Sequence, residues 1–169
     1  MGVGGEKWGS IAMFRGQYPL TMDAKGRIAI PARYRAQLEA DGGQVITTVD
    51  LYQRCIAVYP FAVWEPIEGS LNNVPVADLV GQKLRRRLVG RAVDCDLDAQ
   101  GRILLSAELR QYAGLEKRVQ MVGLGKKFEL WDEGRLHLYR RDEQEDPEQA
   151  VNLGQEELSA HSLLGTLPL

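Results

Sequence analysis

The sequence has few of the residues on which metal sites, disulfide scaffolds and nucleophilic catalysis depend. Its 169 residues include two cysteines, Cys55 and Cys95, and two histidines, His137 and His161. Two cysteines are too few for a disulfide scaffold, and their spacing matches no zinc motif. We therefore expect both thiols to be small buried apolar groups in a reduced, cytoplasmic protein, with no metal and no cofactor.

Long apolar segments are also missing. No run approaches the roughly 18 residues of a membrane helix, and the first eight residues lack the basic stretch and apolar core of a secretion signal. No serine–histidine–aspartate, cysteine–histidine or paired-carboxylate pattern stands out, which argues against an enzyme with a small-molecule substrate. At 44% hydrophobic and 26% charged residues, the composition is typical of a globular protein that buries a core.

The net charge of −2 is unevenly distributed along the chain. Residues 1–127 contain 18 basic and 13 acidic side chains, whereas residues 128–169 contain three basic and ten acidic ones. A basic body joined to an acidic tail is typical of nucleic-acid binders. A solvated tail explains the acidic residues equally well, so charge alone leaves both interpretations open.

An internal repeat is the most informative feature of the sequence. Residues 23–35 recur as residues 98–110, with seven of 13 positions identical. The similarity continues beyond this motif, where residues 45–49 and 54–58 correspond to 119–123 and 127–131. The chain is therefore a duplicated unit of roughly 45 residues, which is too short to bury its own core. Each unit must pack on its copy or on another chain.

Both units have the same predicted order of elements. In the first, Tyr18, Leu20 and Met22 alternate with polar or small residues, which indicates a half-buried strand. Residues 23–26 form a turn in which Gly26 can adopt a positive φ. The pattern then predicts a strand through residues 28 and 30, a short helix from Pro31 to about Leu38, and strands at 44–49 and 54–59.

A helical segment separates the two units. Trp64, Ile67 and Leu71 share one helix face, and Val80, Leu84 and Leu88 share another. Because proline disrupts a helix interior, Pro66 predicts that the first helix begins at about Glu65. Arg85, Arg86 and Arg87 on the second helix are either a phosphate-binding run or a solvated face.

Two other short motifs have structural explanations. Residues 94–98 resemble the start of a calcium loop, but the glycine falls at the wrong position and Leu105 stands where a glutamate is needed. We interpret them as an acidic turn. Residues 123–127 lack the spacing and hydroxyl of a phosphate-binding loop, and they predict a hairpin turn.

The turn at residues 23–27 stands in a basic context that its copy lacks. The segment around this turn, residues 14–38, contains five basic residues: Arg15, Lys25, Arg27, Arg33 and Arg35. The equivalent stretch, 95–115, is slightly acidic. Strand alternation directs Arg27 away from the core, where its guanidinium suits a phosphate or a guanine edge. Alternatively, Arg27 pairs with Asp23 to brace the turn, as Arg102 would with Asp98.

Six segments together carry a resemblance to a known family. They are Met13-Phe14-Arg15-Gly16, Asp23-Ala24-Lys25-Gly26-Arg27, Pro31-Ala32-Arg33-Tyr34-Arg35, Ala57-Val58-Tyr59-Pro60, Asp98-Ala99-Gln100-Gly101-Arg102 and Phe128-Glu129-Leu130-Trp131-Asp132. Residues 13–141 resemble the MraZ family of bacterial transcriptional regulators, encoded at the head of the division and cell-wall gene cluster. The sequence departs from the family in residues 1–12, which precede its usual start, and in Gln100, which replaces a lysine.

The resemblance implies an α/β (α+β) fold with two tandem AbrB-like swapped-hairpin units, similar to a double-psi barrel. It divides the chain into an N-terminal extension with the Met-Phe-Arg-Gly start (1–16), a first SpoVT/AbrB-like domain (17–64), a helical insert (65–91), a second such domain (92–135) and an acidic tail (142–169).

The resemblance also implies ring-shaped homo-oligomers that bind direct DNA repeats in the promoter of their own operon. Its DNA-reading loop corresponds to Lys25 and Arg27, with Arg15 and Arg33 as flanking contacts. We therefore expect a nucleoid-associated, sequence-specific regulator of transcription that is not an enzyme and has no membrane partner. The alternative is a ring-forming protein scaffold whose loops are only structural.

Overall fold

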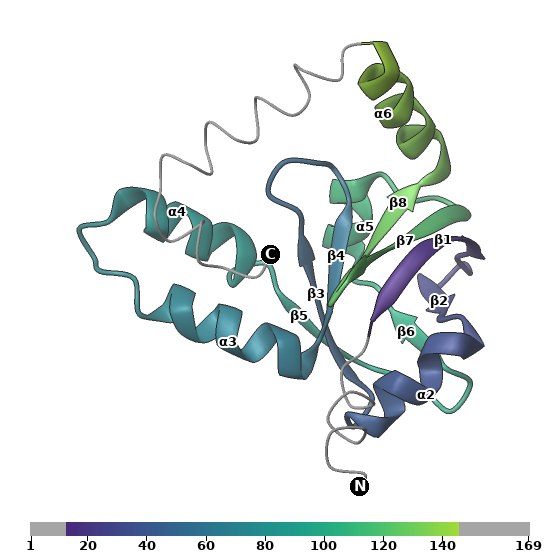
Figure 1. Cartoon of the computed structure of the whole chain (residues 1–169), viewed down its shortest axis with the longest axis horizontal. Coiled ribbons are helices and arrows are strands. Elements are labelled where there is room, and N and C mark those ends of the chain that lie inside the picture. The colour runs from purple at the N-terminus through teal and green to yellow at the C-terminus, as the bar shows by residue number, and fades with distance from the viewer. Residues whose placement is uncertain (1–12, 146–169) are drawn as a thin grey trace, which may run out of the picture.

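The computed structural model of the chain describes residues 13–145, and it is a mixed α/β fold (Figure 1). The predictions for residues 1–12 and for most of the acidic tail lie outside these residues. The first unit contains β1 (Phe14–Thr21), β2 (Arg27–Ala29), α2 (Ala32–Ala40), β3 (Gln44–Val49) and β4 (Ile56–Pro60). The second contains β5 (Val93–Asp96), β6 (Arg102–Leu104), α5 (Ala107–Ala113), β7 (Arg118–Gly125) and β8 (Phe128–Asp132). Helices α3 (Phe61–Asn72) and α4 (Leu79–Leu88) connect the units, and α6 (Glu133–Glu145) follows the second.

The two units exchange strands within one sheet. The six-stranded sheet has the order β1-β7-β8-β4-β3-β5, and every neighbouring pair is antiparallel. Thus β1 of the first unit pairs with β7 of the second, and β5 of the second pairs with β3 of the first. The remaining strands, β2 and β6, pair with each other in a separate two-stranded ribbon. This exchange confirms the swapped-hairpin arrangement.

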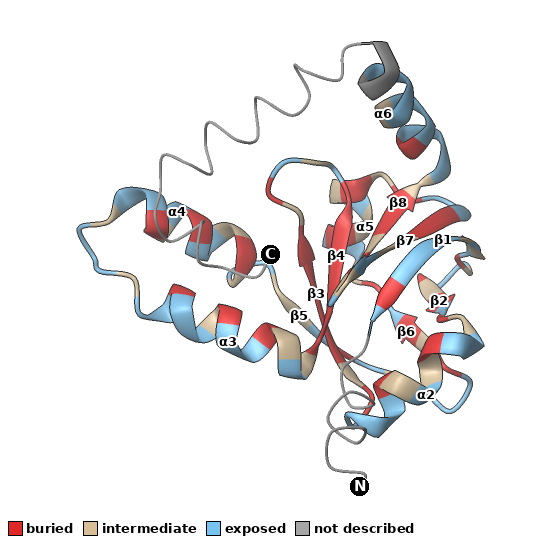
Figure 2. Ribbon diagram, in the orientation of Figure 1, coloured by how far each residue is buried: buried red, intermediate tan, exposed pale blue. Residues whose placement is uncertain are grey.

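The main core is shared by the two units. Ile28 and Ile30 from the first unit, and Ile103 and Leu105 from the second, are at most 1% exposed and lie in one cluster. Buried residues are concentrated in the central strands of the sheet (Figure 2). Each unit was predicted to pack on its copy or on another chain, and the shared core shows that the two copies pack on each other.

Helix α3 begins earlier than the sequence predicted. It starts at Phe61 rather than at Glu65, and it contains Pro66 within its second turn. A proline there removes one backbone hydrogen bond, which is a smaller loss than exposing the apolar face of the helix. That face is fully buried as predicted: Trp64, Ile67 and Leu71.

Helix α4 buries only part of its predicted face. Leu84 and Leu88 are buried, but Val80, which was predicted to share their helix face, is 50% exposed. Because Val80 lies in the first turn, it extends beyond the strands that the rest of the helix covers. Figure 1 shows α3 and α4 side by side on the part of the molecule remote from β2 and β6.

Smaller predictions are also confirmed. Cys55 and Cys95 are buried and free. The turn after β7 is a hairpin in which the N–H of Leu124 donates to the carbonyl of Lys127 at 2.9 Å. Within residues 13–145, no helix has the length and apolar character needed to cross a membrane.

Candidate nucleic-acid interface

The turns that precede β2 and β6 have the same geometry. In the first, Oδ1 of Asp23 accepts hydrogen bonds from the backbone N–H groups of Lys25 and Arg27, both at 2.9 Å. Gly26 has φ +88°, a left-handed conformation that suits glycine. In the second turn, Asp98 accepts the equivalent two bonds at the same distance. The duplication therefore extends to individual hydrogen bonds.

An ion pair braces each turn. Nε of Arg27 donates to Oδ2 of Asp23 at 2.6 Å, and Nε of Arg102 donates to Oδ2 of Asp98 at 2.9 Å. The backbone N–H of Arg27, followed by its guanidinium and the N–H of Lys25, lowers the pKa of Asp23 to about 2. The bracing interpretation is thus confirmed, but it uses only Nε. The terminal nitrogens of Arg27 make no hydrogen bond with the described residues, and the side chain is 32% exposed.

The β2–β6 ribbon places both arginines on one face. Its register pairs Arg27 with Leu104 and Ala29 with Arg102, and these four side chains share the outer face. The central residues, Ile28 and Ile103, point into the core.

The two ends of this outer face differ in chemistry. At one end Arg27 and Leu104 lie beside Lys25, and we call these three residues the basic end. At the other end Arg102 and Ala29 lie beside Gln100. The charge difference predicted between the two turns is therefore a difference between two ends of a single surface.

Each turn is supported by the opposite unit. The guanidinium of Arg110 packs directly on Gly26, where an added Cβ would lie 2.8 Å from it. The guanidinium of Arg35 packs on Gly101 in the same way. In addition, the carbonyl of Gly26 accepts a hydrogen bond from the N–H of Leu105 at 2.9 Å. The second unit therefore fixes the position of the basic end.

The two supporting arginines differ in one respect. Nε of Arg35 donates to the carbonyl of Ile30 at 2.5 Å. Nε of Arg110 is buried and has no hydrogen-bond partner among the described residues. The support that Arg110 gives to Gly26 was not predicted from the sequence. Its equivalence to Arg35 in the repeat was a signal that could have indicated it.

Comparison with known proteins identifies the family. A family model described as "MraZ protein, putative antitoxin-like" matches residues 13–87 and again residues 88–153. A relative named "Transcriptional regulator MraZ" from Shewanella denitrificans is 50% identical over 122 residues, 72% of this chain and 80% of the relative. The chain belongs to the MraZ family. Two further relatives with that name are 51% identical (Nitrosomonas europaea, 71% of this chain and 81% of the relative) and 46% identical (Coxiella burnetii, 77% and 86%).

The structure divides the four DNA-binding residues predicted from the MraZ resemblance into two pairs. Lys25 and Arg27 lie together at the basic end. Arg15 and Arg33 are both exposed, and hydrogen bonds through two tyrosines link them. The hydroxyl of Tyr34 donates to the carbonyl of Arg15 at 2.8 Å, and Arg33 donates to the hydroxyl of Tyr18 at 3.2 Å.

Arg15 and the basic end are far apart along β1. Arg15 is near the start of this strand and Asp23 follows its end, eight residues later. Eight residues of extended chain span roughly 25 Å. No hydrogen bond or ion pair joins the two pairs within residues 13–145. The structure therefore does not bring all four side chains to one contact point.

A cavity of about 460 Å³ adjoins the basic end. Its walls include Lys25 and Arg110, but also Asp94 and Asp96. Two positive and two negative side chains leave it without the net positive charge that would attract a small anion. The outer face of the ribbon is therefore the better candidate for a nucleic-acid contact.

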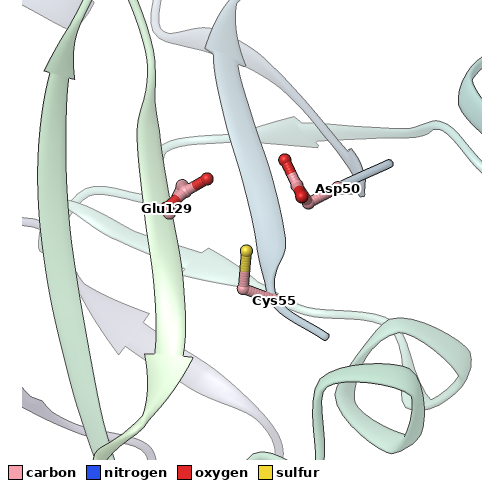
Figure 3. Close-up of side chains that lie close together, drawn as sticks. All are labelled: Asp50, Cys55 and Glu129. Carbon is pink, nitrogen blue, oxygen red and sulfur yellow. The ribbon is translucent and has the colours of Figure 1, made fainter. Parts of the chain in front are cut away.

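A partly buried polar cluster beside the sheet was not predicted from the sequence. Asp50, Cys55 and Glu129 place three metal-ligating atoms within 4.8 Å of one another (Figure 3). They come from the turn before β4 and from β8, which are distant in sequence and adjacent in the sheet. Oε1 of Glu129 also accepts a hydrogen bond from Nε1 of Trp131 at 2.9 Å.

The charges around this cluster favour a structural role. Burial and the neighbouring carboxylates of Glu129 and Asp50 raise the pKa of the Cys55 thiol, which favours its protonated form. Burial alone would lower the pKa of Lys127, but Tyr59, Asp50 and Glu129 outweigh burial and raise it. The ammonium of Lys127 therefore supplies the positive charge that balances the carboxylates.

Proposed function

We propose that this chain is a sequence-specific DNA-binding regulator of transcription whose basic end reads DNA. The observation that carries the proposal is Arg27, which is held by Asp23 through Nε while its terminal nitrogens stay available beside Lys25. The names of the relatives, all transcriptional regulators, support the same function.

The proposed contact uses the ribbon in the major groove. A two-stranded antiparallel ribbon fits that groove, and arginine is the side chain most often paired with guanine there. Arg27 would donate to the O6 and N7 atoms of a guanine, while Lys25 would contact a phosphate. Because Asp23 fixes Arg27 before binding, little side-chain entropy would be lost in forming the contact.

Arg15 and Arg33 would serve as secondary phosphate contacts. Their distance from the basic end, roughly 25 Å along β1 for Arg15, requires that they reach a different part of the duplex. Contacts with phosphate position a protein without specifying sequence, which suits their place outside the ribbon.

We further propose that the chain forms a ring-shaped homo-oligomer that binds direct repeats in the promoter of its own operon, the division and cell-wall gene cluster. One ribbon offers few contacts, so tight binding requires several ribbons that engage evenly spaced repeats. Val76 and Leu79, which are 89% and 79% exposed near the start of α4, offer apolar surface for assembly. Such a regulator would act in the cytoplasm, at the nucleoid.

Titration of the protein with its own upstream DNA at several salt concentrations tests the function. Each phosphate contact should contribute about −0.9 to the slope of log affinity against log salt concentration. A duplex of scrambled sequence serves as the control. Equal affinity for both duplexes, or no binding to either, would favour the protein scaffold over the regulator.

A further inference from the structure

Leu104 is an exposed apolar side chain at the basic end of the candidate DNA surface. It is 57% exposed, and the ribbon register places it directly opposite Arg27. At the equivalent position of the first unit, opposite Arg102, the residue is Ala29. The apolar side chain is therefore large only at the basic end.

Packing within the chain does not account for Leu104. The ribbon directs Ile103 into the core and Leu104 to the opposite face, beside Lys25 in the wall of the adjoining cavity. A leucine that keeps most of its surface in water, opposite Arg27 and in one cavity wall with Lys25, contributes little to folding. Its position indicates a ligand that presents apolar surface next to negative or hydrogen-bond-accepting groups.

DNA presents that combination in the major groove. The C5-methyl group of thymine projects there and is contacted by apolar side chains, next to the acceptor atoms of guanine that arginine binds. Residues directly opposite on antiparallel strands have Cβ atoms about 5 Å apart, and successive bases are about 3.4 Å apart. A ribbon that places Arg27 on one base therefore has Leu104 within reach of an adjacent one.

We propose that Leu104 is a specificity-determining residue that contacts the methyl group of a thymine next to the base bound by Arg27. This inference rests on the proposed function. It makes recognition a joint property of the two units, because the arginine comes from the first and the leucine from the second.

A double-mutant cycle between protein and DNA tests the proposal. The upstream DNA is prepared with thymine or with uracil, which lacks only the methyl group, first throughout one repeat and then at single positions. For the unaltered protein, loss of the contacted methyl should weaken binding roughly fourfold, the effect of exposing one methyl-sized apolar group. For Leu104→Ala, thymine and uracil duplexes should bind equally. Leu138→Ala, which alters a comparably exposed leucine (52%) on α6, should keep the fourfold preference.

Each outcome decides the proposal. If Leu104→Ala keeps the preference for thymine, or if the unaltered protein has none, Leu104 does not read a methyl group. If Leu104→Ala changes the oligomeric mass in solution, the side chain belongs to a subunit interface instead. Failure of the proposed function is distinguishable, because the unaltered protein would then bind the upstream duplex no better than a scrambled one.

Discussion

Arg27 and Arg102 occupy equivalent positions in the two turns, and each pairs with the equivalent aspartate. Their other neighbours differ. Lys25 and Leu104 adjoin Arg27, whereas Gln100 and Ala29 occupy the equivalent places around Arg102. The repeat therefore contains its own control, because any difference between the two arginines in DNA binding must arise from these neighbours.

Replacing each arginine with alanine separates structure from DNA binding. The stability loss should be similar for Arg27→Ala and Arg102→Ala, within about 1 kcal/mol, because both remove one partly exposed ion pair. Arg27→Ala should abolish specific binding, since a lost bidentate base contact costs roughly 1–3 kcal/mol at every ribbon engaged. Arg102→Ala should keep most of the affinity. Urea unfolding and fluorescence anisotropy measure the two effects, and equal affinity losses would contradict the assignment of the basic end.

Glu129 provides a second prediction at the residue scale. Burial raises its pKa, and the Asp50 carboxylate adds to that rise. A carboxyl group whose pKa is higher in the folded than in the unfolded state contributes stability that is present at low pH. That contribution is lost as the pH rises through the folded value.

Glu129→Gln removes this dependence while Oε1 still accepts the hydrogen bond from Trp131. The unfolding free energy of the unaltered protein, relative to the variant, should therefore fall as the pH is raised from about 4 to 8. Urea titrations at several pH values measure it, with Glu116→Gln, a substitution at an exposed carboxyl group, as the control. A difference that rises with pH would mean that the pKa of Glu129 is lower in the folded than in the unfolded protein.

At the scale of elements, the two turns of the β2–β6 ribbon are supported by arginines from helices outside the ribbon. Arg110 from α5 supports Gly26, and Arg35 from α2 supports Gly101. Arg35 also satisfies the backbone carbonyl of Ile30, whereas Nε of Arg110 has no hydrogen-bond partner within residues 13–145. The two supports therefore differ in what they contribute to stability and in which turn they position.

Because of this difference, Arg35→Ala and Arg110→Ala should rank in opposite order for the loss of stability and for the loss of DNA affinity. Arg35→Ala should lower the unfolding free energy more than Arg110→Ala, by about 1 kcal/mol, because it leaves a partly buried carbonyl without its donor. Arg110→Ala should lower DNA affinity more, because it frees the turn that holds Lys25 and Arg27. The salt slope should stay unchanged, since no phosphate contact is lost. If Arg110→Ala reduces the slope by about 0.9, Arg110 itself contacts a phosphate.

Local patterns predicted most of these elements. Alternation in residues 18–22 and the Asp-Ala-Lys-Gly turn indicated β1, the turn and β2, and the repeat transferred that prediction to the second unit, although these strands pair with the other unit rather than with each other. The start of α3 was predicted too late in the chain because Pro66 was expected to lie in the first turn of the helix rather than in its interior. The burial of the apolar side chains of the helix outweighs that local preference. The charged cluster around Glu129 and the position of Leu104 opposite Arg27 could not be predicted, because both depend on which strands pair.

At the scale of the whole molecule, basic and acidic residues are concentrated in different parts of the chain. The basic ribbon is in a body with a net positive charge, and the acidic residues are concentrated near the C-terminus. A single ribbon has few contacts, so the affinity of an assembly depends on how many ribbons bind at once and falls steeply with salt. Any acidic segment that competes with DNA for the same cations would reduce non-specific binding first.

Removing residues 146–169 tests this competition. The segment has four acidic and no basic residues, so its removal changes the formal net charge from −2 to +2. In the described part of the chain the buried side chains end at Leu136, so the truncated protein should keep its melting temperature. Its affinity for scrambled DNA should rise about fivefold in 50 mM salt and much less at 300 mM, where charges are screened over shorter distances.

A matched variant separates charge from length. The full chain with these four residues, Asp146, Glu148, Glu156 and Glu157, changed to their amides should show the same rise in non-specific affinity as the truncated chain. If only the truncation raises the affinity, the segment acts by occupying space rather than by its charge. If truncation lowers the melting temperature or disrupts the oligomer, the segment packs on the folded protein. The charge of the C-terminal residues would then be secondary to their role in assembly.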